Sequence, residues 1–269
     1  MEQPEPDVQP GDLIAGRYRV DRELGRGGMA TAYASTDTLN GTCLVVKRLL
    51  PQAGSTLDEV TRLFEHEYHV LQQLRHPRVV QAFDFGYDDQ SRAFYTMEWL
   101  PGADLRTQSP MPYQRACAVL ADVCSALSLL HSRRLVHRDV TTGNIRCSAD
   151  GHAKLLDFGA VVPFGTTPRL LGTPPFCPPE VVHGQALDGR VDLFALGATL
   201  YFAITGRHAY PARSFELLPT YWCSVPVRPS RFDERVPPAL DQLVMSLLAL
   251  DRNARVPARL PRSWSGYVG

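Results

Sequence analysis

The sequence has no excess of charge of either sign. It contains 28 lysine and arginine residues and 28 aspartate and glutamate residues, which gives a formal net charge of zero. A protein that binds nucleic acid or an anionic membrane surface through its overall field carries a clear positive excess. We therefore expect neither kind of partner, and any charge-based recognition must be local.

The sequence also lacks paired or clustered cysteines. Its six cysteines are scattered, without a C-x-x-C pair or a cysteine–histidine cluster at metal-ligand spacing. Cys117 and Cys124 lie seven residues apart in an apolar helical pattern, which is typical of small buried side chains rather than a disulfide or a zinc site. The pattern predicts reduced thiols and a cytoplasmic protein.

Long apolar runs, secretory signals and internal repeats are missing as well. The longest apolar stretch, 193–204, is interrupted by Gly197 and Thr199 and is shorter than the roughly 20 residues that span a bilayer. Residues 1–11 are rich in proline and acid and lack the basic start and apolar centre of a secretory signal, so they are expected to form a disordered tail. We predict no membrane segment and no repeat architecture.

The first part of the chain has the pattern of a small antiparallel sheet. Apolar and β-branched runs predict five strands, at residues 18–25, 32–38, 42–49, 79–86 and 93–99. Asn40-Gly41 is a turn signal between the second and third of these. A helical apolar pattern over 60–74 precedes Pro77, which disfavours helix in the residue before it.

After Pro101-Gly102 the pattern becomes mainly helical, beginning with a predicted helix over 112–132. The 269 residues are enough to bury a full core. We therefore predict an α+β fold with a β-rich lobe at 12–100, which holds one main helix, and a larger α-rich lobe at 101–259. Residues 260–269 would form a short tail.

A glycine-rich segment, L-G-R-G-G-M-A at 24–30, lies between two predicted strands. Glycines at such a position allow backbone N–H groups to approach phosphate oxygens closely. A plain hairpin turn is the alternative interpretation of the same residues. The segment alone does not separate the two.

One lysine, Lys47, follows the apolar residues Leu44, Val45 and Val46 in a predicted strand. Its charge is costly there unless a carboxylate or a phosphate meets it, and Glu67 on the following helix can supply the carboxylate. The alternative is a lysine at a strand edge that extends into water.

The strongest signal is H-R-D-V-T-T-G-N at 137–144, followed by a hairpin at Asp150-Gly151 and by L-L-D-F-G at 155–159. Asp157 comes 18 residues after Asp139, at the end of a predicted strand. A carboxylate at that point can hold a magnesium ion against phosphates. The default reading of such polar residues between strands is a turn, which Asp150-Gly151 satisfies.

In order and spacing these segments resemble the protein-kinase signature set from residue 18 to residue 255, and Gly27-Gly28-Met29 is similar to bacterial eukaryotic-like serine/threonine kinases. The resemblance implies a bilobal kinase fold with ATP and Mg²⁺ as cofactors. It implies that Lys47 holds the α- and β-phosphates and pairs with Glu67, that Asn144 and Asp157 bind magnesium, and that Asp139 accepts the proton of the substrate hydroxyl.

The same resemblance implies a nucleotide site. Met97 would lie at the back of its pocket, and Glu98 to Leu100 would form the hinge whose backbone contacts adenine. The implied nucleotide-binding residues are Leu24, Gly25, Arg26, Gly27, Gly28, Met29, Ala30, Ala32, Val45, Lys47, Glu67, Met97, Glu98 and Leu100.

Further along, residues 172–180 resemble the peptide-binding segment of the family, with P-P-E where A-P-E is usual. By the resemblance, Glu180 pairs with Arg255, and Asp192 anchors the backbone of the catalytic loop; the alternative for Asp192 is an ordinary helix N-cap. His137 and Phe158 take structural roles in the two motifs.

Arg138 beside the catalytic acid is the usual sign of a segment ordered by phosphorylation, because a guanidinium binds phosphate bidentately. The segment between Asp157 and Glu180 holds three threonines and no serine or tyrosine. Thr166 and Thr167 are the candidate phosphosites, and Thr173 is expected to bond to Asp139.

Several positions depart from the family pattern. Ala30 replaces a third glycine, and a positive φ there would cost alanine about 1 kcal/mol. Ala32 and Val45 exchange the usual sizes of two residues in the adenine pocket, which predicts a reshaped roof with its volume kept. Thr141 replaces a lysine that neutralises the γ-phosphate, which predicts slower catalysis. Pro257 and Pro261 interrupt the chain where the family adds another helix, which predicts a shortened large lobe.

We therefore expect an ATP- and Mg²⁺-dependent serine/threonine protein kinase of bacterial signalling. Its expected partners are protein substrates and a second copy of itself, with which it would associate to autophosphorylate in trans. The departures motivate a first alternative, a pseudokinase that binds nucleotide or acts as a scaffold. A second alternative is a small-molecule phosphotransferase, but those enzymes lack the peptide-binding segment seen at 172–180.

Overall fold

The structure is a computed structural model that describes residues 8–50, 57–148, 150–167 and 170–255. The chain divides into two compact units, Met1–Arg75 with Val80–Leu100, and His76–Val79 with Pro101–Gly269. Residues 1–7 of the predicted tail, the tail 260–269 and the two prolines at 257 and 261 lie outside the described residues.

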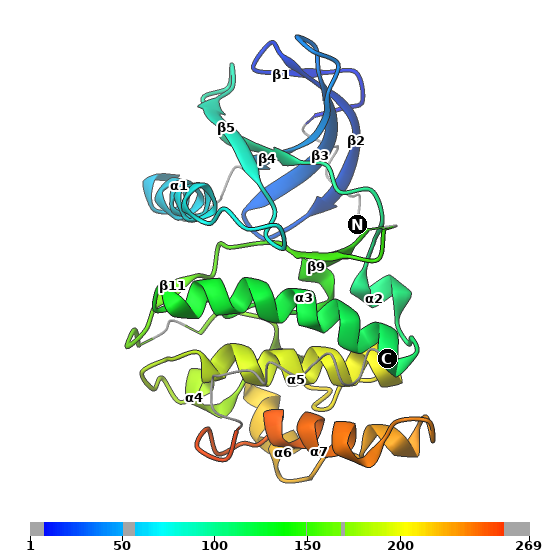
Figure 1. Ribbon diagram of the computed structural model, residues 1–269. Coiled ribbons are helices and arrows are strands. Elements are labelled where there is room, and N and C mark those ends of the chain that lie inside the picture. The colour runs from blue at the N-terminus through cyan, green and yellow to red at the C-terminus, as the bar shows by residue number, and fades with distance from the viewer. Residues whose placement is uncertain (1–7, 51–56, 149, 168–169, 256–269) are drawn as a thin grey trace, which may run out of the picture. The chain divides into compact units, whose positions relative to one another are not determined.

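The first unit is built on a six-stranded antiparallel sheet with the order β1-β2-β3-β4-β6-β5 (Figure 1). Its strands are β1 (Leu13–Ile14), β2 (Tyr18–Arg26), β3 (Ala30–Asp37), β4 (Cys43–Leu49), β5 (Ala82–Tyr87) and β6 (Ala93–Glu98). One helix, α1 (Leu57–Gln73), accompanies the sheet. Alternation along β6 explains the two packed faces, because neighbouring residues of a strand point to opposite sides.

On one face of this sheet, Phe94 packs into a buried cluster with Tyr18, Tyr33 and Ile14. Val8 belongs to the same cluster and is 9% exposed, so the packed chain begins within the predicted 1–11 tail. On the other face, the ring of Tyr95 lies 5.0 Å from that of Phe64 on α1. The apolar side of α1 thus covers the face opposite the cluster.

The second unit is mainly helical. Its helices are α2 (Leu105–Gln108), α3 (Tyr113–Ser132), α4 (Pro179–Val182), α5 (Arg190–Thr205), α6 (Leu218–Trp222) and α7 (Pro238–Leu247). Short strands form two small sheets, β10-β9-β7 and β11-β8, from β7 (Ala103–Asp104), β8 (Leu135–Val136), β9 (Ile145–Cys147), β10 (Ala153–Leu155) and β11 (Val162–Pro163). 3₁₀ turns lie at Thr142–Asn144, Pro174–Phe176, Phe215–Leu217 and Pro229–Arg231.

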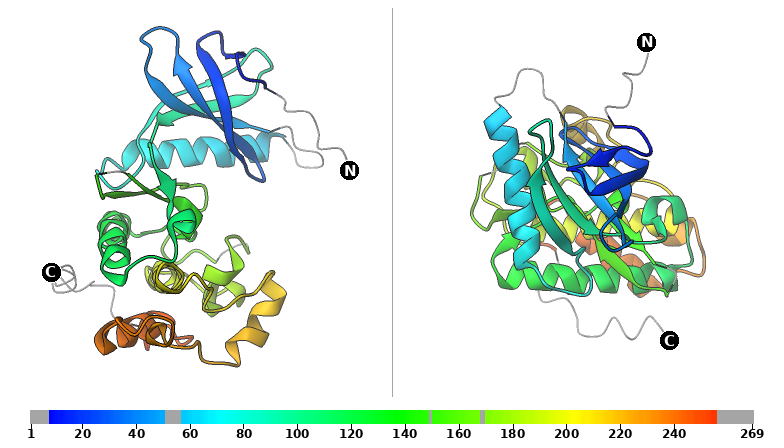
Figure 2. Two further views of the ribbon diagram at one scale, coloured as in Figure 1. Left: turned by 90° about the vertical axis from the view of Figure 1, so that its right-hand side faces the viewer. Right: turned by 90° about the horizontal axis from the view of Figure 1, so that it is seen from above.

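Helix α5 forms the centre of this unit, between α3 and α7 in both side views (Figures 1 and 2). Thirteen of its residues are buried, so the helix is buried on all sides rather than along one stripe. At Gly197, an added Cβ would lie 2.6 Å from the Cβ of Leu247, so only glycine allows α7 to approach so closely. The helix is therefore a fixed support for the loops that contact it.

Helix α3 is the one helix of the described residues that is long and apolar enough to cross a membrane by length and composition. Its apolar residues Val119, Leu120, Val123, Leu127 and Leu130 are fully buried in the second unit. A core helix of this kind passes the same test, so α3 is not a convincing membrane span.

The prediction of a strand at 79–86 is wrong at its beginning. Strand β5 starts at Ala82, and Val79 instead forms an isolated parallel bridge with Leu155 in the second unit. The N–H of Leu155 donates to the Arg78 carbonyl at 2.9 Å. The apolar pattern of Val79 and Val80 does not show that the chain passes from one unit to the other between them.

Candidate active site

In the first unit, Lys47 and Glu67 form a largely buried ion pair. Lys47 lies on β4, and its Nζ is 2.7 Å and 2.9 Å from the two carboxylate oxygens of Glu67 on α1. Glu67 is fully buried, and the hydroxyl of Tyr95 donates to its Oε1 at 2.8 Å. A buried carboxylate needs such partners, because the desolvation of an unpaired charge is costly. The pair fixes the ammonium of Lys47.

Tyr95 is a site residue that the sequence reasoning missed. It lies directly opposite Lys47 in the ladder between β4 and β6, with Lys47 Nζ 5.8 Å from the centre of its ring. The available signal was a tyrosine in a strand that also holds Phe94 and Met97. Only the register of the sheet shows that its hydroxyl reaches Glu67.

The glycine-rich segment forms a tight turn between β2 and β3. The N–H of Gly27 donates to the Ala30 carbonyl at 2.8 Å, and the N–H of Leu50 donates to the Met29 carbonyl at the same distance. A Cβ built on Gly25 or Gly28 meets no atom within 4 Å, so the space beside the Cα atoms of these two glycines is open. Leu24 and Arg26 are the flanking residues of β2.

The strain expected at Ala30 does not occur. Ala30 is the first residue of β3 and is not among the described residues with positive φ. Since its backbone is extended, the cost of about 1 kcal/mol for alanine in the left-handed region does not apply. This departure from the family pattern leaves the turn unstrained.

Ala32 and Val45 share one face of the sheet. Ala32 pairs with Lys47, and Val45 pairs with Ala34 across β3 and β4, which puts the two residues in diagonal positions. Val45 also pairs with Met97 of β6. The residues implied for the adenine pocket are therefore neighbours.

At the end of β6, Glu98 is bonded to the segment before β5. Its N–H donates to the Gln81 carbonyl at 2.9 Å, and its Oε1 accepts the N–H of Gln81 at 2.8 Å. The N–H of Glu98 is thus occupied within the sheet. Contacts from the implied hinge to a base must come from other backbone groups, up to Leu100 at the end of the first unit.

In the second unit, Asp139 is held by two side chains. Asn144 Nδ2 donates to Asp139 Oδ2 at 2.7 Å, and Thr173 Oγ1 donates to Asp139 Oδ1 at 3.0 Å. Burial raises the pKa of Asp139 above its ordinary value, and the bonds from Thr173 and Asn144 oppose this rise. The carboxylate is therefore a better proton acceptor than an exposed aspartate.

The loop that carries Asp139 is fixed by Asp192 on α5. Asp192 is fully buried and accepts the backbone N–H groups of His137 at 2.9 Å and Arg138 at 2.8 Å. Its Oδ2 also lies 2.8 Å from His131 Nε2. Although burial raises the pKa of Asp192, the contact with His131 and the other bonds bring it below its ordinary value. The N-cap of α5 is Gly189, so the alternative reading of Asp192 as a cap is wrong.

Backbone strain concentrates around this loop. Of the five non-glycine residues with positive φ in the described ranges, Arg134, Arg138 and Asp157 lie between residues 134 and 157. Positive φ is unfavourable for side chains such as that of arginine, so surrounding bonds must hold it. At Arg138 the bond from its N–H to Asp192 is one of these.

Asp157 follows β10 and lies beside the end of the catalytic loop. The N–H of Leu156 donates to the Asn144 carbonyl at 2.8 Å, which brings the two predicted metal ligands close along the backbone. Phe158 is fully buried, and its ring is 4.8 Å from that of His137. Burial lowers the pKa of His137, and its Nδ1 accepts the N–H of Asp139 at 3.3 Å.

The donor set at Asn144 and Asp157 fits a hard cation. Asn144 uses its amide nitrogen on Asp139, which leaves its amide oxygen as the ligand atom, and Asp157 supplies carboxylate oxygens. Within the described ranges no group of three or more histidine, cysteine or acidic residues forms a metal cluster. Magnesium is commonly held by one or two protein oxygens together with substrate phosphates, and it does not need a site made of protein ligands alone. The pair of Asn144 and Asp157 is therefore suited to magnesium.

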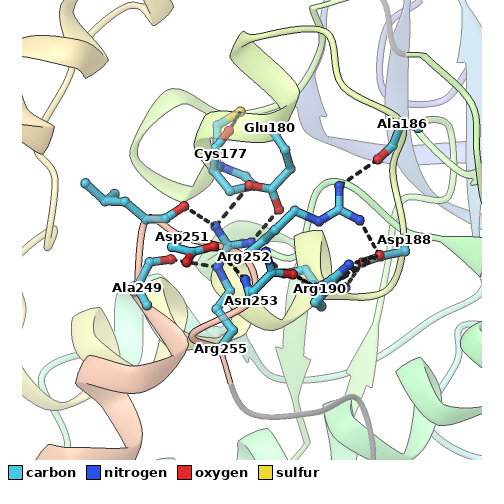
Figure 3. A network of polar contacts seen from close by, with 12 residues as sticks. Cys177, Glu180, Ala186, Asp188, Arg190, Ala249, Asp251, Arg252, Asn253 and Arg255 are labelled. Carbon is cyan, nitrogen blue, oxygen red and sulfur yellow. Dashed lines mark hydrogen bonds and ion pairs between the residues drawn. The ribbon is translucent and has the colours of Figure 1, made fainter.

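The segment 172–180 is joined to the end of the described chain. Arg255 Nη2 is 3.0 Å from Glu180 Oε2, Nη1 contacts Oε1, and both side chains are buried (Figure 3). Arg255 also donates to the Ala249 carbonyl at 2.7 Å. The structure thus brings together the two residues that the resemblance paired.

A second ion pair in this network was not predicted. Arg252 contacts Asp188 and donates to the Ala186 carbonyl at 2.9 Å, and Arg190 Nη2 is 2.7 Å from Asp188 Oδ2 (Figure 3). Although burial raises it, the hydrogen bonds and charges of Arg190 and Arg252 lower the pKa of Asp188 to about 2. Asp188, in the segment before α5, is therefore held by two arginines, Arg190 and Arg252.

The segment with the candidate phosphosites is tied by its backbone on both sides. The N–H of Phe164 donates to the Arg134 carbonyl at 2.8 Å, and the N–H of Gly165 donates to the Leu187 carbonyl at 2.8 Å. The carbonyl of Thr166 accepts the N–H of Leu187, and Thr167 is exposed. Arg138 is the arginine expected to bind a phosphate on this segment, and burial lowers the pKa of its guanidinium.

A comparison with known families decides what this set of residues belongs to. The family model of the protein kinase domain matches residues 18–260. The chain belongs to the protein kinase family. The predicted resemblance and the α+β kinase fold are confirmed.

Several curated bacterial kinases are similar to this protein kinase. The serine/threonine-protein kinase PksC of Streptomyces coelicolor is 32% identical over 91% of the chain and 48% of its own length. The DNA damage-responsive serine/threonine-protein kinase RqkA of Deinococcus radiodurans is 33% identical over 96% of the chain and 40% of its own length. The serine/threonine-protein kinase pkn3 of Myxococcus xanthus is 32% identical over 99% of the chain and 51% of its own length. The chain spans about half or less of the length of these relatives.

Proposed function

We propose that this kinase transfers the γ-phosphoryl group of ATP to serine and threonine hydroxyls of proteins. The observation that carries the proposal is the hydrogen bond from Thr173, in the peptide-binding segment, to the partly buried carboxylate of Asp139. It joins the segment expected to hold a substrate to the group expected to accept its proton. The curated relatives named as serine/threonine kinases support the same acceptor class.

Each group named in the proposal has a separate task. Lys47, fixed by Glu67, would neutralise phosphate charge, and the oxygens of Asn144 and Asp157 would hold magnesium. Bound ATP and magnesium supply the phosphoryl group and the charge neutralisation. Asp139 orients the acceptor hydroxyl and takes its proton, for which its raised pKa is favourable.

The proposal also covers regulation and the cellular compartment. We propose that Thr166 and Thr167 are phosphorylated in trans by a second copy, and that the protein acts in the cytoplasm, where its six free cysteines stay reduced. The pseudokinase alternative is supported by Thr141, which is buried and stands where the family has a cation. A small-molecule acceptor is less well supported, because the segment 172–180 is present and ordered against Asp139.

The acceptor class can be tested with purified protein, γ-labelled ATP and magnesium. We would offer a generic basic protein, peptides that contain only serine, threonine or tyrosine as acceptors, and small hydroxyl compounds. Label on serine and threonine peptides that is lost in Asp139→Asn supports the proposal. Label on the small compounds alone would replace it with the phosphotransferase reading, and no transfer to any acceptor would favour the pseudokinase.

A further inference from the structure

Thr199 is a buried polar residue at the centre of an apolar helix. It lies on α5 among Ala198, Leu200 and Leu196, and none of its surface is exposed. A buried hydroxyl needs a hydrogen-bond partner, because an unmade bond leaves the desolvation cost uncompensated. Thr199 Oγ1 donates to the backbone carbonyl of Val140 at 2.9 Å.

The direction of this bond is unusual for a threonine inside a helix. Such a residue ordinarily bonds to the carbonyl four residues earlier in its own helix. Thr205 of the same helix does so, with its Oγ1 2.8 Å from the Tyr201 carbonyl. Thr199 instead reaches outside the helix to the residue that follows Asp139. Helix α5 therefore offers a matched pair of threonines with different partners.

Thr199 and Asp192 act on the same loop from the same face of α5. They are seven residues apart, close to two helical turns, so their side chains project in nearly the same direction. Asp192 accepts the N–H groups of His137 and Arg138, and Thr199 donates to the carbonyl of Val140. The backbone of Asp139 is held on both sides, by an acceptor before it and by a donor after it.

The second contact has a clear physical purpose. Val140 is fully buried, so its carbonyl is shielded from water and gains much from a donor. The bond also limits rotation of the peptide group that joins Val140 to Thr141, which begins the turn leading to Asn144. Loss of the donor would loosen the loop on the side of Asp139 that Asp192 does not hold.

We propose that Thr199 is a positioning residue for phosphoryl transfer, which acts through Val140 on the carboxylate of Asp139. The inference rests on the proposed function for its effect on rate, but not for its effect on the loop. It is specific to the hydroxyl rather than to the size of the side chain.

The test compares Thr199→Val, which keeps the shape and removes the hydroxyl, with Thr199→Ser, which keeps the hydroxyl. Thr205→Val is the control, because it removes from the same helix a hydroxyl that bonds to Tyr201 and Arg207 and not to the loop of Asp139. We expect Thr199→Val to lower kcat by about tenfold with KM for ATP within about twofold of wild type, and Thr199→Ser to restore most of the rate. Thr205→Val is expected to leave kcat nearly unchanged.

Hydrogen exchange of residues 137–144, followed by mass spectrometry, gives a readout independent of activity. We expect faster exchange there in Thr199→Val, with Thr199→Ser and Thr205→Val close to wild type. If Thr199→Val is too unstable, Thr199→Ser against Thr199→Ala gives the same comparison. An inactive wild-type protein would overturn the proposed function alone, whereas unchanged exchange and kcat in the hydroxyl-free variants would overturn the role of Thr199.

Discussion

At the scale of single residues, the proposed chemistry depends on the carboxylate of Asp139, whose ionised form is disfavoured by burial. Asp139 is partly buried and accepts hydrogen bonds from Asn144 and Thr173. Burial outweighs these bonds and raises the pKa of Asp139. The same cost that makes Asp139 a better proton acceptor therefore reduces the stability of the folded state once the carboxylate is ionised.

This cost predicts the effect of Asp139→Asn on stability and its dependence on pH. A raised folded-state pKa means that the stabilising contribution is complete below the unfolded pKa and is lost as pH rises through the folded one. Replacement by a neutral amide should thus raise Tm at pH 7.5 while lowering phosphoryl transfer by about 10²–10⁴-fold. Thermal unfolding between pH 4.5 and 8 should show the Tm gain shrinking as pH falls. A gain that grows toward acid pH would contradict the account.

Thr141 offers a second prediction at this scale. Thr141→Lys supplies the cation that the family pattern places there, and a cation on the developing phosphate charge lowers the barrier. We expect kcat to rise by about threefold or more. Thr141→Gln is the control, because it adds length without charge and should not raise kcat. Equal effects of the two variants would show that charge at this position does not limit turnover.

At the scale of elements, helix α5 and the chain before it support the loops on either side. The buried pair of Glu180 and Arg255 and the more exposed pair of Asp188 and Arg252 join α4 and the start of α5 to residues 249–255. The side chains of the first pair are 3% and 0% exposed, and those of the second are 27% and 24% exposed. Because it is more deeply buried, the pair of Glu180 and Arg255 should matter more for the free energy of unfolding when one partner is removed.

The two arginines should therefore respond differently to removal. Arg255→Ala leaves the buried carboxylate of Glu180 unpaired, which we expect to lower the free energy of unfolding by about 3–5 kcal/mol. Arg252→Ala breaks a partly solvated pair, which we expect to cost about 1 kcal/mol or less. Urea unfolding of both variants beside wild type measures the difference. Similar losses in the two variants would contradict the assignment by burial.

The segment with Thr166 and Thr167 carries the prediction on regulation. Phosphate on either threonine adds negative charge and strong acceptors that an arginine such as Arg138 can bind, which would order the segment. We expect the double variant Thr166→Ala with Thr167→Ala to lower kcat by about 5- to 100-fold. Thr220→Ala, an exposed threonine of α6, is the control. Full turnover of a completely dephosphorylated wild-type enzyme would exclude this regulation.

At the scale of the whole molecule, the sequence was most informative where chemistry is concentrated in short segments. Asp139, Asn144 and Asp157 lie within two motifs, and the structure brings them together through the backbone bond between Leu156 and Asn144. Most strands and the helix at 112–132 also follow from local patterns, because alternation and helical spacing are local properties.

What the sequence did not predict depends on contacts between distant segments. Tyr95 reaches Glu67 because of the register between β4 and β6, and Thr199 reaches Val140 because of where α5 lies. Alternation shows which face a residue occupies but not which partner it meets there. Val79 has the pattern of a strand in the first unit and yet pairs with Leu155 in the second.

The most direct test of the central claim separates nucleotide binding from phosphoryl transfer in one preparation. The sequence contains two lysines, Lys47 and Lys154, so a lysine-reactive ATP analogue reports occupancy near Lys47 with Lys154 as an internal reference. We predict ATP-protectable labelling of Lys47 in wild type and in Asp139→Asn, with transfer to serine and threonine peptides in wild type alone. Labelling of Lys47 without transfer by wild-type protein, before or after phosphorylation of its threonines, would contradict the account.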